Sequence, residues 1–165
     1  MRIEKLYPMV SARLMIVNLT DTVARAAATL SKPGVGLAVV CSDDGVARGV
    51  LSKSDLIRHI AHRSGPGSIE GLMSPKIVGC RPTDDLQTAW QAMVDNRLQN
   101  MPVLGDQAKP LGVLDIRDAL KVLYEQEQLQ EHMMENYIAG LATDSLSMGI
   151  QAVKAPVSSC LRTST

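Results

Sequence analysis

The 165-residue chain repeats itself at an offset of 63 residues, and this repeat limits the possible folds more than any other feature. Aligned without a gap, residues 9–62 and 72–125 share ten identities in 54 pairs. Ordinary composition gives roughly three or four by chance. Three identities are consecutive, because Gly49-Val50-Leu51 falls on Gly112-Val113-Leu114. A duplicated segment predicts two similar structural units that stack on each other.

Both repeats show the same order of expected elements, which is strand, helix, strand, strand, helix. The first repeat predicts a strand at 14–17, a helix capped by Thr20 and Asp21 and ending near Leu30, strands at 37–41 and 48–51 around a turn at 42–45, and a helix from Ser52 to His62. The second predicts a strand at 77–80, a helix at 84–96, strands at 100–104 and 110–114, and a helix from Ile116. One repeat of about sixty residues is near the lower limit for independent stability. We therefore expect a single α+β globule with pseudo-symmetric halves.

Composition excludes several classes of function. The 17 basic and 17 acidic side chains cancel, and one Trp, three Tyr and no Phe leave little for bases to stack on. Both features argue against a nucleic-acid partner. The three cysteines, Cys41, Cys80 and Cys160, form no CxxC pair, so we expect neither a disulfide framework nor a thiolate metal site. No apolar stretch has the length of a signal peptide or membrane span. We expect a cytoplasmic protein with no membrane partner.

Catalytic motifs are not found in the sequence. It contains no Gly-x-Ser-x-Gly elbow, no glycine-rich phosphate loop and no His-Glu-x-x-His helix. The histidines His59, His62 and His132 lack a carboxylate or cysteine at ligand spacing. We expect a protein that is not an enzyme, with no catalytic residue, no bound metal and no required cofactor. A small enzyme stays open as an alternative, to be tested by turnover of a bound nucleotide.

Several ordered motifs resemble one family. They are Met73-Ser74-Pro75-Lys76-Ile77-Val78, Pro82-Thr83-Asp84, Met101-Pro102-Val103 and Gly112-Val113-Leu114 with Asp118. This pattern resembles the CBS domain, named after cystathionine β-synthase, and two tandem copies resemble a CBS domain pair, or Bateman module. The resemblance covers a first unit at 9–62 and a second at 72–125, which leaves a C-terminal segment at 126–165. It implies two clefts between the units that commonly bind AMP, ADP, ATP or S-adenosylmethionine.

The resemblance also implies roles for a short motif. In this family the pattern is Gly, two apolar residues, Ser or Thr, two variable residues, and an Asp that accepts hydrogen bonds from ribose hydroxyls. The first repeat has it intact at Gly49–Asp55, with Ser52 placed to meet phosphate oxygens. Ser52 and Asp55 are equally ordinary residues for a helix N-terminus. The second repeat keeps Asp118 but has Asp115 at the Ser or Thr position, where its charge would repel phosphate. We expect a competent cleft at Asp55 and a weakened or altered one at Asp118.

An adenine pocket is implied at the end of the first strand and just before the second strand of each repeat. By position these residues are Val17, Asn18, Gly36 and Leu37 in the first repeat and Cys80, Arg81, Gln99 and Asn100 in the second. Thr20 and Thr83 could add hydroxyl groups toward phosphate. The scarcity of aromatic residues fits such an aliphatic pocket.

The segment after the second repeat favours helix to about Gly140. An apolar stripe runs along it through Leu120, Leu123, Leu129, Met133, Tyr137 and Leu141. This stripe either meets a partner or folds back on the globule, and beyond Thr143 we expect a loosely ordered chain.

Together these features predict a stand-alone regulatory module that senses an adenosine-containing ligand. The resemblance implies a homodimer that signals to an unknown regulated protein by conformational or oligomeric change. The alternative is a protein–protein interaction scaffold whose clefts do not bind ligand.

Overall fold

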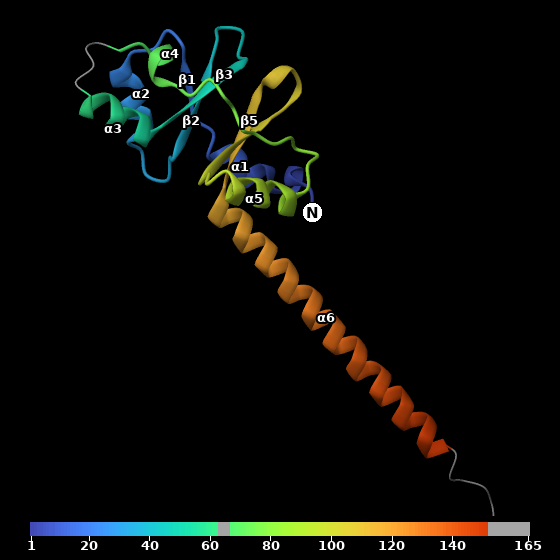
Figure 1. Cartoon of the computed structure of the whole chain (residues 1–165). Helices are drawn as coiled ribbons and strands as arrows, with labels where there is room; N and C mark the ends of the chain where they lie inside the picture. The colour runs from blue at the N-terminus through green and yellow to red at the C-terminus, as the bar shows by residue number, and fades with distance from the viewer. Residues whose placement is uncertain (63–66, 152–165) are drawn as a thin grey trace, which may run out of the picture. The chain divides into compact units, whose positions relative to one another are not determined.

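The computed structural model describes residues 1–62 and 67–151 (Figure 1). The chain divides into one compact body at Met1–Leu123, which contains both repeats, and a second that begins at Tyr124. The longest element, α6 (Ile116–Gln151), starts in the first body and continues into the second. Among the described residues, no helix has the length and apolar character needed to cross a membrane.

The first repeat forms a three-stranded sheet with two helices. Its strands β1 (Ile16–Asn18), β2 (Leu37–Cys41) and β3 (Ala47–Ser52) lie in the order β1-β2-β3, with β1 parallel and β3 antiparallel to β2; the helices are α2 (Val23–Leu30) and α3 (Lys53–Ala61). Ser52 caps α3 as predicted. The predicted cap of α2 is wrong, because the Thr22 side chain accepts the hydrogen bond from the Arg25 amide.

The second repeat has two regular strands instead of three. They are β4 (Asn100–Leu104) and β5 (Pro110–Asp115), joined through η2 (Asp106–Ala108) and preceded by α5 (Leu86–Asp95). The strand predicted at 77–80 is wrong, since only a single bridge joins Cys80 to Val103 there. The reason lies at Pro102, the counterpart of Val39, whose amide donates to the Met15 carbonyl at 2.8 Å. Proline has no N–H to donate, so this ladder bond is lost.

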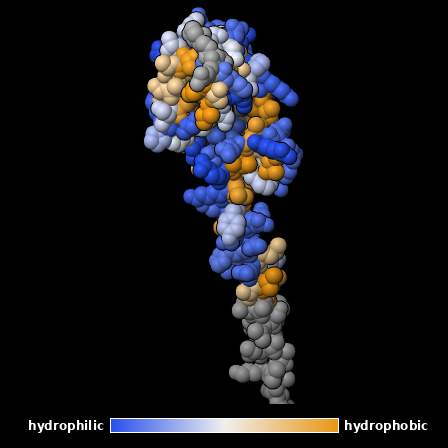
Figure 2. All heavy atoms as spheres, turned by 60° about the vertical axis from the view of Figure 1, so that its left-hand side comes forward, coloured by the Kyte–Doolittle hydropathy of each residue, from blue (hydrophilic) through white to orange (hydrophobic). Residues whose placement is uncertain are grey.

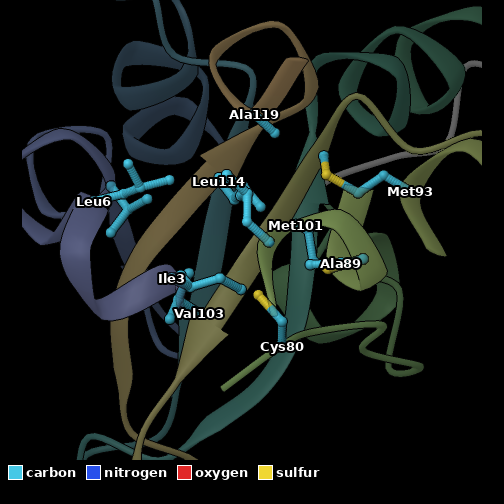
Figure 3. Close-up of a cluster of buried hydrophobic side chains, with 11 residues drawn as sticks. Ile3, Leu6, Cys80, Ala89, Met93, Met101, Val103, Leu114 and Ala119 are labelled. Carbon is cyan, nitrogen blue, oxygen red and sulfur yellow. The ribbon is translucent and has the colours of Figure 1, made fainter. Parts of the chain in front are cut away.

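The segment that precedes each repeat packs into the core of the other repeat. The N-terminal segment forms η1 (Ile3–Leu6) and α1 (Tyr7–Ala12), and Ile3 and Leu6 lie in the core of the second repeat with Cys80 and Val103 (Figure 3). The short helix α4 (Ile69–Leu72) places Ile69 in the core of the first repeat. Leu6 and Ile69 are 63 residues apart, so this crosswise packing follows the internal symmetry. Neither segment was predicted as a helix.

Two equivalent glycines allow this close packing. A Cβ atom on Gly112 in β5 would lie 2.7 Å from the backbone carbon and oxygen of Val10 in α1. A Cβ on Gly49 in β3 would lie 2.7 Å from the Ser74 carbonyl oxygen. Each preceding segment can therefore lie directly on a strand of the opposite repeat only because glycine stands there.

A shared apolar interface joins the two repeats. One buried cluster combines Leu37, Val39, Cys41 and Ala47 of the first repeat with Val113 of the second. Together with the crosswise segments, this interface confirms the predicted α+β globule with two pseudo-symmetric halves, extended by a C-terminal helix.

The helix α6 is longer than predicted. It continues to Gln151, so the loose order expected beyond Thr143 is wrong as far as that residue. Residues 63–66 and 152–165 lie outside the described part of the chain. The side chains of Leu129, Met133 and Tyr137 are more than half exposed, and Figure 2 shows hydrophobic side chains at the surface of this helix among hydrophilic ones.

Candidate functional site

A cavity of about 660 Å³ lies between the two repeats. Twelve of its lining residues form six pairs that are each 63 residues apart: Gly34 with Arg97, Val35 with Leu98, Gly36 with Gln99, Leu37 with Asn100, Ser52 with Asp115, and Ser54 with Arg117. Lys53 completes the lining. Because equivalent positions face each other, the cavity lies on the pseudo-two-fold axis. Its size is in the range of about 300–1,000 Å³ typical of small-molecule sites.

The two walls of the cavity differ in chemistry although their backbones are equivalent. The first repeat contributes small uncharged residues at four of the paired positions, which are Gly34, Gly36, Ser52 and Ser54. At the matching positions the second repeat contributes Arg97, Gln99, Asp115 and Arg117. At these four pairs the first repeat offers space and hydroxyl groups, and the second repeat offers charged and amide side chains.

The charged side chains of the lining give the cavity a net positive charge. Lys53, Arg97 and Arg117 are cationic, and Asp115 is the only carboxylate among the lining residues. Lys53 and Arg97 are both exposed residues. A concave surface with this imbalance attracts anions.

Asp115 is buried, with 3% of its surface exposed, and it is paired. Its carboxylate oxygens accept hydrogen bonds from Nε and Nη2 of Arg117 at 3.0 and 2.8 Å. A guanidinium nitrogen of Arg13 lies 3.8 Å away. The Arg117 hydrogen bonds hold the pKa of Asp115 below its usual value, although burial acts in the opposite direction. The charge of Asp115 is thus compensated, and the repulsion of phosphate expected from the sequence does not follow.

This pairing predicts a pH-dependent contribution of Asp115 to stability. A carboxylate whose pKa is lowered by folding stabilises the protein above the pKa of the unfolded chain, about 3.9, and loses this effect as pH falls through the folded pKa. The difference in unfolding free energy between wild type and Asp115→Asn should be largest at neutral pH and shrink below about pH 4. Urea unfolding at a series of pH values measures it. A difference that does not change with pH would contradict the assignment.

Asp55 lies beside the cavity in a helix-capping arrangement. Its Oδ2 accepts hydrogen bonds from the backbone nitrogen and Oγ of Ser52 at 2.8 and 2.7 Å. Its Oδ1 accepts a hydrogen bond from Arg58 at 3.1 Å. Ser52 lines the central cavity, whereas Asp55 lines a neighbouring pocket of about 290 Å³ with Arg58. The capping role is therefore present, and the carboxylate lies next to the cavity-lining turn.

Asp118 has a different partner. Its Oδ2 accepts a hydrogen bond from Nε of Arg13 at 2.7 Å. Nη1 of the same guanidinium donates to the carbonyl oxygen of Gly34 at 3.3 Å. The two equivalent carboxylates, Asp55 and Asp118, are thus held by cations of different origin.

The structure brings only part of the predicted site together. Gly36, Leu37, Ser52, Gln99 and Asn100 line the cavity. The other predicted residues do not line it. They are the strand-end residues Val17, Asn18, Cys80 and Arg81, the hydroxyl residues Thr20 and Thr83, and the carboxylates Asp55 and Asp118.

Strand direction explains this separation. Because β1 is parallel to β2, Asn18 at the end of β1 pairs with Cys41 at the end of β2. The cavity lies at the opposite end of the strands, where Leu37 begins β2 and pairs with Ser52.

Burial raises the pKa of the Cys80 thiol to about 12, so this side chain is a neutral core residue.

Some lining residues were not predicted from the sequence, and these include Lys53, Ser54, Arg97 and Arg117. The internal repeat holds a signal for two of them, because Ser54 and Arg117 are equivalent positions. Each directly precedes the motif carboxylate of its repeat, which is Asp55 or Asp118. Among the described residues, no group of three or more potential metal ligands is found.

The comparisons with known proteins agree on one family. The model of the CBS domain matches the chain twice, over residues 7–62 and 69–125. The CBS domain-containing protein YhcV of Bacillus subtilis is 26% identical over 139 residues, which cover 83% of this chain and 91% of the relative. An uncharacterized 17.7 kDa protein of Acidianus ambivalens is 21% identical over 126 residues, covering 76% of this chain and 77% of the relative.

Solved structures share the fold. The CBS domain pair of protein MJ0100, in complex with 5′-methylthioadenosine and S-adenosyl-L-methionine, aligns with a TM-score of 0.66 at 14% identity, covering 77% of this chain and 98% of that one. The CBS domain protein PAE2072 from Pyrobaculum aerophilum, complexed with AMP, aligns with a TM-score of 0.63 at 26% identity, covering 72% and 89%.

Proposed function

Because the chain belongs to the CBS domain family, we propose that it is a regulatory module that binds an adenosine-containing ligand in the cavity between its repeats. The observation that carries this proposal is the lining itself, which pairs equivalent positions of both repeats and includes Ser52 of the Gly49–Asp55 motif. Neighbours of the same fold have been solved with AMP, or with 5′-methylthioadenosine and S-adenosyl-L-methionine. A ligand held by both repeats can alter how they pack.

Charge favours a phosphate-bearing ligand such as AMP, ADP or ATP. Lys53, Arg97 and Arg117 line the cavity, and the one carboxylate of the lining is paired with Arg117. S-adenosylmethionine carries a cationic sulfonium, which this positive surface disfavours. We therefore propose that adenosine phosphates bind more tightly than S-adenosylmethionine.

The motif residues have distinct roles in this proposal. Backbone N–H groups in the first turn of α3, which have no partner within the helix, would donate to phosphate oxygens. The Ser52 hydroxyl would join them after giving up its hydrogen bond to Asp55. Asp55 accepts hydrogen bonds from the ribose hydroxyls after giving up its contact with Arg58. The Arg58 side chain is 64% exposed and the Asp55 side chain 12%, so the guanidinium can move into water while the carboxylate stays in place.

Signal transfer would begin at the junction of β5 and α6. Asp115 ends β5, Ile116 begins α6, and the lining residue Arg117 belongs to the first turn of that helix. A ligand that binds two packing arrangements with different affinities shifts their populations. We propose that this shift, within a homodimer, changes the affinity for a regulated protein.

Thermal unfolding with AMP, ADP, ATP, S-adenosylmethionine and NAD tests the proposal. A ligand at a hundredfold excess over its Kd stabilises the folded state by about 2.7 kcal/mol, a rise of several degrees in Tm for a chain of this size. The expected result is a larger rise with the adenosine phosphates than with S-adenosylmethionine. If no compound changes the Tm, the ligand-binding role is contradicted and an interaction scaffold becomes the better account.

A further inference from the structure

One side chain, Arg13, connects three separate parts of the first body. It follows α1 directly, and its Nε donates to Asp118 Oδ2 at 2.7 Å. Its Nη1 donates to the Gly34 carbonyl at 3.3 Å and lies 3.8 Å from Asp115 Oδ2. The Arg13 side chain is 28% exposed and the Asp118 side chain 22%. The guanidinium is therefore largely withdrawn from water and has three oxygen partners.

The internal repeat supplies a built-in comparison for this contact. The residue 63 positions after Arg13 is Lys76, and the counterpart of Asp118 is Asp55. Lys76 is exposed, and the ion pair of Asp55 is made by Arg58, three residues along the same helix. A basic residue thus stands at both equivalent positions, but only Arg13 reaches across to a carboxylate of the opposite repeat. The multiple donors of a guanidinium allow it to hold several acceptors, which an ammonium does less well.

We propose that Arg13 is an internal competitor for Asp118, and that it restricts the protein to one ligand per chain, bound on the Asp55 side. This inference rests on the proposed function, in which Asp55 accepts the ribose hydroxyls, and extends that role to its counterpart Asp118. A ligand on the Asp55 side displaces Arg58 from Asp55 Oδ1, and the Arg58 side chain is 64% exposed. A ligand on the Asp118 side must displace a part-buried guanidinium from Asp118.

The loss of one charge-assisted hydrogen bond corresponds to about tenfold or more in affinity. Arg13 therefore lowers the affinity of the Asp118 side by at least this factor. Removing the guanidinium should expose a second binding event that the wild-type chain does not show.

Titration calorimetry with AMP tests the inference in four proteins: wild type, Arg13→Gln, Arg13→Gln with Asp118→Ala, and Arg58→Ala. Wild type should bind one AMP per chain. Arg13→Gln should bind a second AMP, and this event should disappear in the double variant because its acceptor is gone. Arg58→Ala is the matched control, since it frees the other carboxylate from an exposed partner, and it should change affinity by at most about fivefold.

The outcomes separate this inference from the proposed function. If wild type binds one AMP and Arg13→Gln gains nothing, the role of Arg13 is refuted while the ligand site stands. Two AMP molecules on wild type, or a second event that survives Asp118→Ala, would also refute it. If neither wild type nor Arg13→Gln binds AMP, the Arg13 inference fails, and the thermal-unfolding series decides separately whether another adenosine ligand binds. Circular dichroism checks that each variant is folded, and Arg13→Lys takes the place of Arg13→Gln if the latter is not.

Discussion

Replacing Ile3 by alanine should lower the free energy of unfolding by about 2–5 kcal/mol, although Ile3 lies outside both repeats. Its side chain is fully buried in the core of the second repeat, next to Cys80 and Val103. The backbone nitrogen of Ile3 also donates to the Asp84 carbonyl at 3.1 Å. The truncation leaves a cavity, and the surrounding side chains cannot easily close it because the backbone of Ile3 is held in place by this hydrogen bond.

The matched control for this change is Glu4→Ala in the same short helix η1. The Glu4 side chain is half exposed and forms one ion pair with Arg2 at 3.8 Å, so its removal should change stability by no more than about 0.5 kcal/mol. Urea unfolding at neutral pH measures both variants. Equal effects of the two substitutions would mean that the N-terminal segment is not part of the core of the second repeat.

Filling the cavity with a tryptophan at Ser54 should weaken binding of the adenosine ligand by about a hundredfold or more, equivalent to about 2.7 kcal/mol. Ser54 is exposed, it lies in the first turn of α3, and it lines the cavity opposite its equivalent Arg117. An indole ring there occupies space that the ligand needs without entering the apolar core. Stability without ligand should therefore stay close to that of wild type.

Ile57→Trp is the control that separates occlusion from any effect of a large aromatic residue. Ile57 lies in the same helix, is 65% exposed and does not line the cavity. Its variant should keep the ligand-induced rise in Tm, whereas Ser54→Trp should lose it. If both variants keep the rise, the ligand binds elsewhere on the protein.

Much of the fold could be predicted because each expected helix or strand in one repeat can be compared with its equivalent in the other. The range of β2 and the Ser52 cap of α3 agree with the sequence prediction. The missing strand at 77–80 shows where local patterning fails. Those residues are apolar enough for a strand, but a strand also needs a donor on its neighbour, and Pro102 has none.

The crosswise packing of Ile3 and Ile69 could not be predicted from local sequence. Short apolar segments before each repeat carry too little periodicity to show which core they enter. The equivalent glycines Gly49 and Gly112 hold the structural signal, because each makes room for the segment of the other repeat. Their meaning becomes clear only when the partner segment is seen.

The sequence prediction placed candidate site residues at both ends of the strands, and only those at one end line the cavity. Ser52, Gly36 and Asn100 line the cavity because β2 and β3 are antiparallel, so the start of one lies beside the end of the other. Asn18 lies at the far end because β1 and β2 are parallel. Whether neighbouring strands run in the same direction is a tertiary property, which residue patterns within one strand do not contain.

The most direct test of the central claim is calorimetric titration of AMP into the wild-type chain, with Ser54→Trp and Ile57→Trp measured alongside. The account predicts saturable binding to wild type and Ile57→Trp and no saturable binding to Ser54→Trp. An absence of binding to wild type, or equal binding to all three proteins, would contradict an AMP site in the cavity between the repeats.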